Sequence, residues 1–389
     1  MNSLAQVLTH GRLLVLCGSG GVGKTTTSAA LAVAAARQGR RVGVLTIDPA
    51  QRLLQALGLR DQQHPANQPL EVLPRLSEQL PDPATGGSLH ALMLDAELGA
   101  VTMVERLLPD PRLRERVLGN RIYRAFLPAL ASSPEYIALE LISQLQREQR
   151  FDLLVLDTPP MHNALDFLHA GGTLSGFVNE RVLKWFAMMP RPGIKAPRFS
   201  FLQTGASMAM TVLGRLFGDE VMPDIADFFL SFQDVLPKLR DATEATDRLL
   251  RAAGTHFVIV TAPGETALRE ARHLHGELGR AGVPFAGFVC NRVLHLPAAL
   301  REAQAADPRA EQLLATLAAH GLAQHGNSLQ QAAQWLERLA AADAEQVASL
   351  RHLAGHHAFV SVAAQEVNDL HTLADLARHG DRLLAAQPA

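Results

Sequence analysis

The segment from Gly18 to Thr25 restricts the possible folds of this chain more than any other feature of the sequence. It reads Gly-Ser-Gly-Gly-Val-Gly-Lys-Thr, which matches the pattern G-x-x-x-x-G-K-[ST] of phosphate-binding loops. An apolar run, Leu13 to Cys17, precedes the loop, and a helical pattern of Ala and Leu follows it from Thr25 to Gln38. Because another apolar run, Val42 to Ile47, comes next, the sequence predicts a strand, a glycine loop, a helix and a parallel strand in that order.

The loop contains the groups that a nucleotide and its magnesium ion need. Its glycines let backbone N–H groups turn inward around a phosphate, and the following helix adds the positive end of its dipole. Lys24 is expected to reach the β- and γ-phosphates of ATP, and the Thr25 hydroxyl to bind Mg²⁺. The residues expected to contact the nucleotide here are Gly20, Gly21, Val22, Gly23, Lys24, Thr25 and Thr26.

Two aspartates end predicted strands and are candidates for the chemistry. Asp157 closes the apolar run Phe151 to Leu156, where a carboxylate would hold Mg²⁺ or its bound water, although it could also cap a turn. Asp48 ends a strand next to Pro49, where it could orient or deprotonate the attacking water or simply start an Asp-Pro turn. The hypothesis therefore assigns catalysis to Asp48 and Lys24, and metal binding to Thr25 and Asp157.

Alternating strands and helices over the rest of the chain predict an α/β fold with a parallel sheet. Further strands are expected at Leu89 to Leu94, His256 to Thr261, Phe285 to Cys290 and Phe359 to Val362. Helices are expected at Glu135 to Gln149, Glu265 to Gly282, around Leu329 to Leu353 and near Leu370 to Ala385. The segment Gln62 to Pro83 is rich in Pro and Gln, which predicts a loop. We expect residues 1–389 to form one domain.

The stretch from about residue 174 to 250 differs from the rest, because it is rich in Met and Phe and has no convincing strand pattern. It predicts a helical subdomain inserted into the α/β core. Its Met and Phe side chains either pack on the core or on a second copy, or they form an adaptable groove for a client. A third possibility is attachment to a membrane surface through Trp185 to Phe201, where prolines prevent a continuous amphipathic helix.

Composition argues against several classes of protein. Lys and Arg total 36 against 38 for Asp and Glu, so no surplus of positive charge indicates nucleic-acid binding. The two cysteines, Cys17 and Cys290, end predicted strands and are expected to be buried rather than disulfide-bonded. No apolar run reaches the ~20 residues of a membrane-spanning helix. Met1 to His10 lacks the pattern of a secretory signal, so a cytoplasmic location is expected.

Five segments together resemble the arsenite-pump ATPase family, which also includes the cytosolic ATPase that targets tail-anchored membrane proteins. They follow the order of the family: Gly20 to Thr27, Thr46 to Ala50, Leu156 to Pro160, Ala164 to Leu168 and Cys290 to Arg292. The resemblance implies a doubly wound sheet, a dimer that encloses the nucleotide, and switch loops carrying Asp48 and Asp157. It also implies that Asp48 positions water, that Asn291 contacts the adenine base, and that the inserted subdomain senses ATP and presents a groove to a client or membrane partner.

The sequence departs from the family pattern in three respects. Ser19 stands where many relatives carry a second lysine that crosses to the partner's nucleotide, so our hypothesis is that Arg52 or a paralogous subunit supplies that cation. Asn163 replaces the histidine that the family has after its second aspartate. Two cysteines are too few for an arsenite site of three thiolates within one chain, and they do not form the zinc-binding pair of the targeting ATPase.

The favoured hypothesis is an ATPase that uses MgATP to switch a homodimer, or a heterodimer with a paralogue, and so controls a hydrophobic client or membrane partner. One alternative is an ATPase subunit that energises an anion or metalloid efflux pump, which the cysteine count disfavours. Another is a nucleotide-gated holdase or scaffold with little turnover, which Ser19 favours.

Overall fold

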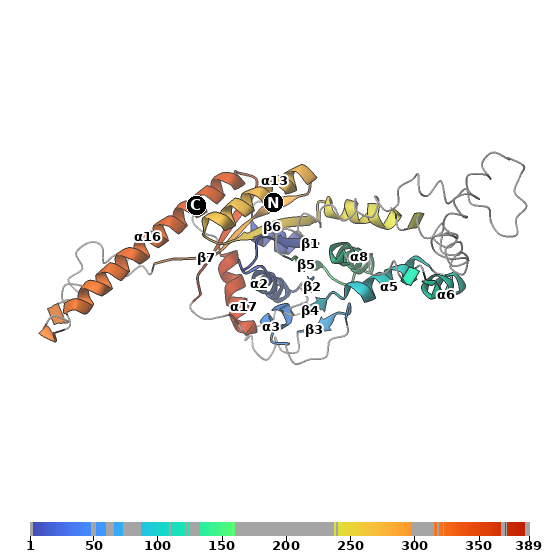
Figure 1. Ribbon diagram of the computed structural model, residues 1–389, viewed down its shortest axis with the longest axis horizontal. Helices are drawn as coiled ribbons and strands as arrows, with labels where there is room; N and C mark the ends of the chain where they lie inside the picture. The colour runs from blue at the N-terminus through green and yellow to red at the C-terminus, as the bar shows by residue number, and fades with distance from the viewer. Residues whose placement is uncertain are drawn as a thin grey trace, which may run out of the picture.

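The computed structural model describes most of the predicted α/β core (Figure 1). The described residues are 3–47, 52–59, 66–72, 87–108, 110–121, 123–124, 133–159, 237–238, 240–296, 315–316, 319–321, 323–366, 370 and 372–385. Asp48, Asn163 and most of the predicted insertion lie outside them. Within that insertion, residues 237–238 and 240–250 are described and are helical. The client groove and the membrane-surface segment therefore stay predictions.

Eight strands form one sheet in the order β3-β4-β2-β5-β1-β6-β7-β8. They are β1 (Leu13–Cys17), β2 (Arg41–Thr46), β3 (Leu70–Glu71), β4 (Ser88–Met93), β5 (Leu153–Asp157), β6 (Thr255–Thr261), β7 (Phe285–Val293) and β8 (Phe359–Ala364). Every neighbouring pair is parallel except β3 and β4. Because β1 lies between β5 and β6, the sheet grows in opposite directions from it. The doubly wound, mostly parallel fold is confirmed.

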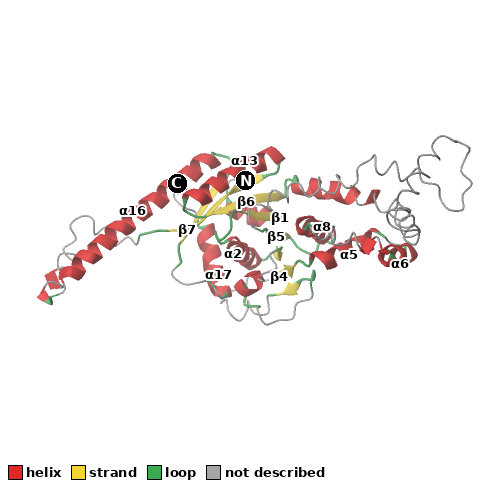
Figure 2. Ribbon diagram, in the orientation of Figure 1, coloured by secondary structure: helices red, strands yellow, loops and turns green. Residues whose placement is uncertain are grey.

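Helices cover both faces of this sheet (Figure 2). They are α1 (Leu4–His10), α2 (Lys24–Arg37), α3 (Arg52–Ala56), α5 (Ala96–Leu107), α6 (Pro111–Gly119), α8 (Pro134–Arg147), α13 (Glu265–Ala281), α16 (Ala323–Ala354) and α17 (Leu373–Leu384). One hydrophobic cluster joins α5, α6, α8, α13 and α16 to one face, and the other joins α1, α2, α3 and α17 to the opposite face. Helix α16 extends well beyond the sheet (Figure 1). Among the described residues, no helix is both long enough and apolar enough to cross a membrane.

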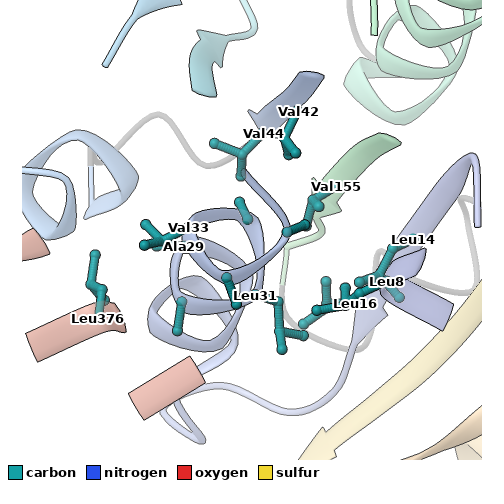
Figure 3. Close-up of a cluster of buried hydrophobic side chains, with 14 of the residues drawn as sticks. Leu8, Leu14, Leu16, Ala29, Leu31, Val33, Val42, Val44, Val155 and Leu376 are labelled. Carbon is teal, nitrogen blue, oxygen red and sulfur yellow. The ribbon is translucent and has the colours of Figure 1, made fainter. Parts of the chain in front are cut away.

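The central strand β1 is apolar throughout because both of its faces are covered. Leu14 and Leu16 pack in the cluster around α2, whereas Val15 packs in the opposite cluster. Figure 3 shows the cluster around α2, which includes Leu31 of α2 and Leu376 of α17. Continuous apolar runs are typical of parallel strands between two helix layers, so β1 holds the following loop on a rigid base.

The contact between α2 and α17 gives a test of this packing. An alanine Cβ at Gly380 would lie 2.7 Å from the Ala30 carbonyl oxygen and 3.1 Å from the Ala34 Cβ. We expect Gly380→Ala to lower the free energy of unfolding by about 1–3 kcal/mol because the helices must move apart. The control is Gly279→Ala on α13, where the new Cβ would have no neighbour within 4 Å apart from adjacent residues and the backbone of α13 itself. It should raise the free energy by roughly 0.5–1 kcal/mol. Urea denaturation measures both, and equal effects would contradict the close packing.

Some elements differ from the sequence-based prediction. The segment Gln62 to Pro83 was expected to be loop, but within it β3 pairs with β4 in antiparallel orientation. Strand β7 continues past Cys290 to Val293 despite two polar residues. Helices α1, α5 and α6 were not predicted, although Asp95 and Asp110 cap the last two through their side chains. These two cap residues are local sequence signals that favour helices at α5 and α6.

Candidate functional site

The phosphate-binding loop joins the carboxyl end of β1 to the first turn of α2. Its backbone depends on glycine at two positions. Gly18 has φ 151°, and a Cβ there would overlap the carbonyl oxygen of Val260 on β6. Gly23 caps α2 with φ 91°, and a Cβ there would overlap the side-chain amide of Asn291. Both positions have a left-handed conformation and no room for a side chain, so the loop is fixed between its neighbours.

Lys24 begins α2, and its side chain folds back over the loop. It is 7% exposed, and its Nζ donates hydrogen bonds to the carbonyl oxygens of Gly18 at 2.9 Å and Ser19 at 2.7 Å. The ammonium is therefore held inside the turn from Gly18 to Lys24. A phosphate oxygen is a stronger acceptor for this cation than a neutral carbonyl oxygen is, because both partners are then charged.

Asp157, at the carboxyl end of β5, is the acidic group of the site. It is 1% exposed, and its Oδ2 accepts hydrogen bonds from Thr25 Oγ1 at 2.7 Å and Thr46 Oγ1 at 3.3 Å. Its Oδ1 accepts one from Ser28 Oγ at 3.4 Å. The register places Leu16 of β1 and Thr46 of β2 opposite Asp157. Two elements, α2 and β2, thus bring three hydroxyl groups to one carboxylate directly beside the loop.

The neighbours of Asp157 compensate only partly for the hydration that its carboxylate loses on burial. Burial raises its pKa above the ordinary value of 3.8 because the charged form loses its hydration. The hydrogen bond from Thr25, the positive charge of Lys24 and the other two hydroxyls lower the pKa, but by less. A divalent cation beside Asp157 would supply the missing positive charge.

The residues fit a magnesium ion that is bound together with a nucleotide. Mg²⁺ prefers oxygen ligands and usually takes only one or two from the protein, leaving the rest to phosphates and water. Thr25 and Asp157 offer such oxygens side by side. Within the part of the chain that the structure describes, no three His, Cys, Asp or Glu side chains gather as a metal site. A fully protein-coordinated metal is therefore not built from the described residues.

The two cysteines are buried, as predicted. Cys17 is 1% exposed and Cys290 is fully buried. Burial raises the pKa of each thiol from 9.0 to about 12 because a thiolate would lose its hydration. For Cys17, a hydrogen bond with Thr158 and the charge of Lys24 oppose this rise only in part. Both thiols are therefore neutral near pH 7, whereas a soft metal or metalloid binds thiolates.

Asn291 lies next to the loop, near the end of β7. It is 6% exposed, and its Nδ2 donates a hydrogen bond to the Val22 carbonyl oxygen at 3.0 Å. The sequence pattern indicated nothing about this contact, which joins residues far apart in the chain. The family resemblance had given Asn291 a place beside the base, and the structure places it against the phosphate loop.

The other candidate residues are placed less fully. Thr26 is half-buried in the first turn of α2, and Arg52 begins α3 and is exposed. Asp48 lies outside the described residues, but the amide of Ile47, directly before it, donates to the carbonyl oxygen of Asp157 at 3.4 Å. Sequence reasoning missed the hydroxyls of Ser28 and Thr46. Ser28 had a signal, because its i+3 spacing from Thr25 places both on one face of α2.

Comparisons with known proteins agree with this geometry. A family model described as anion-transporting ATPase matches residues 11–311. A protein of Aquifex aeolicus with the provisional name arsenical pump-driving ATPase 2 is 30% identical over 176 residues, which cover 44% of this chain and 53% of that protein. The ATPase GET3B of Arabidopsis thaliana is 26% identical over 307 residues, which cover 74% of this chain and 65% of the relative.

An uncharacterised protein of Streptomyces coelicolor is 35% identical over 161 residues, which cover 41% of this chain and 37% of that protein. The chain thus spans between about a third and two thirds of the length of these three relatives. Among these three relatives, GET3B matches the largest part of this chain, about three quarters of its length.

Proposed function

The chain belongs to the anion-transporting ATPase family, and from this premise we propose that it binds MgATP and hydrolyses it to ADP and phosphate. The observation that carries the proposal is the hydrogen bond of 2.7 Å between Thr25 Oγ1 and Asp157 Oδ2, directly beside the phosphate-binding loop. This pair joins the two groups that hold magnesium in P-loop proteins.

Each residue of the site has a distinct proposed task. Backbone amides from Gly20 to Lys24 surround the β-phosphate, and the Lys24 ammonium neutralises charge on the β- and γ-phosphates. Thr25 and Asp157 hold the magnesium ion. When bound, the ion would neutralise the negative charge that develops on the phosphate oxygens. Asp48 orients the attacking water, because it follows directly on Ile47, whose amide bonds to the end of β5.

The proposal extends to the whole assembly. One ATPase domain spans residues 1–389, and the helical segment 174–250 is inserted into it as the client or partner subdomain. ATP binding shifts a homodimer, or a heterodimer with a paralogue, between two states, since a ligand shifts an equilibrium only by binding those states differently. A hydrophobic protein or a membrane partner responds to that shift in the cytoplasm. The support is the family membership, because two relatives carry names that contain ATPase.

A second candidate function is to drive an efflux pump for an anion or metalloid. It is favoured by the name of the Aquifex aeolicus relative, an arsenical pump-driving ATPase. The two buried, protonated thiols argue against metalloid binding by this chain itself. Stimulation of ATP hydrolysis by arsenite or antimonite would favour the pump, whereas an unchanged rate would reject a metalloid as the activator.

Removing the proposed water-positioning group gives the test of the enzyme. We expect Asp48→Ala to reduce steady-state phosphate release by about 10²- to 10⁴-fold, because a positioned general base contributes that much to such reactions. Affinity for MgATP should change little, since Asp48 is expected to contact water rather than the nucleotide. Phosphate release and calorimetric ATP titration measure the two quantities.

Other outcomes of the same assays separate the alternatives. If the wild-type protein binds MgATP but releases no phosphate, the nucleotide-gated holdase is the better description. If Asp48→Ala hydrolyses ATP at the wild-type rate, another group activates the water. Arg52→Ala is measured in parallel, because a homodimer that keeps its full rate without Arg52 would reject this residue as the substitute for the lysine missing at Ser19.

A further inference from the structure

An interruption in the sheet sets the direction of the Asn291 side chain. The pairing of β7 with β8 shifts its register between Cys290 and Val293, so Asn291 and Arg292 fall within an irregularity. Arg292 has φ 59°, a left-handed conformation that non-glycine residues rarely adopt. Such bulges re-aim side chains, and this one lies beside the phosphate-binding loop.

Two hydrogen bonds fix which way the Asn291 amide faces. The backbone N–H of Arg292 donates to Asn291 Oδ1 at 3.0 Å, and Asn291 Nδ2 donates to the Val22 carbonyl oxygen at 3.0 Å. Turning the amide over would place its oxygen against the Val22 oxygen and its NH₂ group against the Arg292 N–H. Both contacts would then be lost, so the donor side of the amide faces the loop.

This contact determines the direction of a donor in the loop. In a trans peptide unit, the C=O and the following N–H point in opposite directions. Because the Val22 carbonyl points at Asn291, the N–H of Gly23 points away from it. Val22 is 4% exposed, and a Cβ at Gly23 would overlap the Asn291 amide. Because both residues are tightly packed, the peptide unit that joins Val22 to Gly23 has little freedom to rotate.

We infer that Asn291 is a positioning residue for the phosphate-binding loop. By holding the Val22 carbonyl, it keeps the Gly23 N–H directed away from β7 and ready for a phosphate oxygen. The inference rests on the proposed function for the identity of the ligand, but the hold on the loop exists without one. The second N–H of the amide and the remaining lone pair of its oxygen are left for the base, so one side chain links both ends of the nucleotide.

A ligand without a base separates the two tasks. We expect Asn291→Ala and the nearly isosteric Asn291→Leu to weaken binding of magnesium tripolyphosphate by roughly 3- to 10-fold, and binding of MgATP by at least as much because the contact with the base is lost as well. The control is Asn120→Ala, which removes another buried asparagine whose Oδ1 accepts the Tyr123 amide, away from the loop. It should leave both affinities unchanged. Isothermal titration measures all four proteins.

Hydrogen exchange of the ligand-free protein is the second measurement. The amides from Gly21 to Lys24 should exchange about 3- to 10-fold faster in both Asn291 variants than in the wild type or in Asn120→Ala, because the loop loses one hydrogen bond. Unchanged exchange would overturn the inference. A loss of affinity confined to MgATP would also overturn it, because Asn291 would then act on the base alone, and so would unchanged affinity for both ligands.

The two measurements also separate this inference from the proposed function. If the wild-type protein binds neither ligand, MgATP binding fails as the function, while the exchange rates still decide whether Asn291 holds the loop. If the wild-type protein binds both ligands and the variants match it in affinity and exchange, the inference fails and the ATPase proposal stands.

Discussion

Lys24→Ala is expected to reduce ATP hydrolysis by at least about 100-fold, the scale on which an electrostatic donor at a developing charge acts. Lys24 is 7% exposed, and its ammonium is held inside the turn by the carbonyl oxygens of Gly18 and Ser19. Because water screens a buried charge little, the ammonium would act strongly on a phosphate bound in the loop. We expect MgATP affinity to fall by about 10- to 100-fold as well, because charge-assisted hydrogen bonds are lost.

A lysine with a similar structural contact provides the control for this variant. Lys238 donates from its Nζ to the carbonyl oxygen of Leu107 at 2.9 Å, a contact that involves none of the site residues. Lys238→Ala should therefore keep its affinity and rate close to those of the wild type. Phosphate release and calorimetric titration are measured on both variants. If Lys24→Ala retains the wild-type rate, the loop is not the site of hydrolysis.

Asp157→Asn is expected to weaken magnesium-dependent nucleotide binding without lowering the stability of the fold. The substitution removes a charge on a residue that is 1% exposed, whereas Thr25 and Thr46 can still donate to the amide oxygen and the Ser28 hydroxyl can accept from the amide NH₂ group. The ligand-free variant should thus be at least as stable as the wild type. Its Mg²⁺-dependent gain in nucleotide affinity should fall by about 10- to 100-fold, because a group that holds the metal is lost.

The direction of the Asp157 pKa shift adds a dependence on pH. Because the folded pKa lies above the ordinary 3.8, the folded protein binds this proton more readily than the unfolded chain does. The resulting stabilisation is fully present below the ordinary value and is lost as the pH rises through the raised folded pKa. Acidification through that window should therefore stabilise the ligand-free wild type relative to Asp157→Asn, and it should weaken Mg²⁺ binding because a protonated carboxyl binds the metal poorly.

Asp152, just before the other end of β5, is the matched control. Its pKa is lowered, first by the hydrogen bond from the Arg41 side chain, so its charged form stabilises the fold above its unfolded pKa. That contribution is lost as the pH falls through the lowered folded value. Asp152→Asn should cost a little stability near pH 7 and leave Mg²⁺-dependent binding intact. Urea unfolding and magnesium titration across pH test the pair, and equal behaviour of the two variants would contradict this account of Asp157.

Local patterns were sufficient to predict the core of the fold and the position of the loop. Buried strands such as β1 and β5 are continuous apolar runs, and the helix after the loop shows its period directly, so the boundaries predicted for them fall within two residues of those observed. The same local signal placed Asp157 at a strand end. The expectation that Thr25 and Asp157 hold the same magnesium ion predicted that their side chains lie together, and the two side chains are hydrogen-bonded at 2.7 Å.

Contacts that depend on tertiary packing were beyond the sequence. Nothing near Val22 indicates that Asn291 bonds to its carbonyl oxygen, because a register shift between β7 and β8 produces that approach. The hydroxyl of Thr46 bonds to Asp157 only because β2 lies beside β5. The predicted role of Asp48 and the inserted subdomain remain predictions, since both depend on residues outside the described part of the chain or on a partner.

The most direct measurement of the central claim is a calorimetric titration of ATP into the wild-type protein and Thr25→Ala, each with and without Mg²⁺. The side chain of Thr25 donates to Asp157 and borders the loop, so it stands where the metal and the phosphates would meet. We predict that Mg²⁺ increases the ATP affinity of the wild type by at least about tenfold and that Thr25→Ala loses most of this increase. An ATP affinity that is the same with and without Mg²⁺ in the wild type would contradict the account.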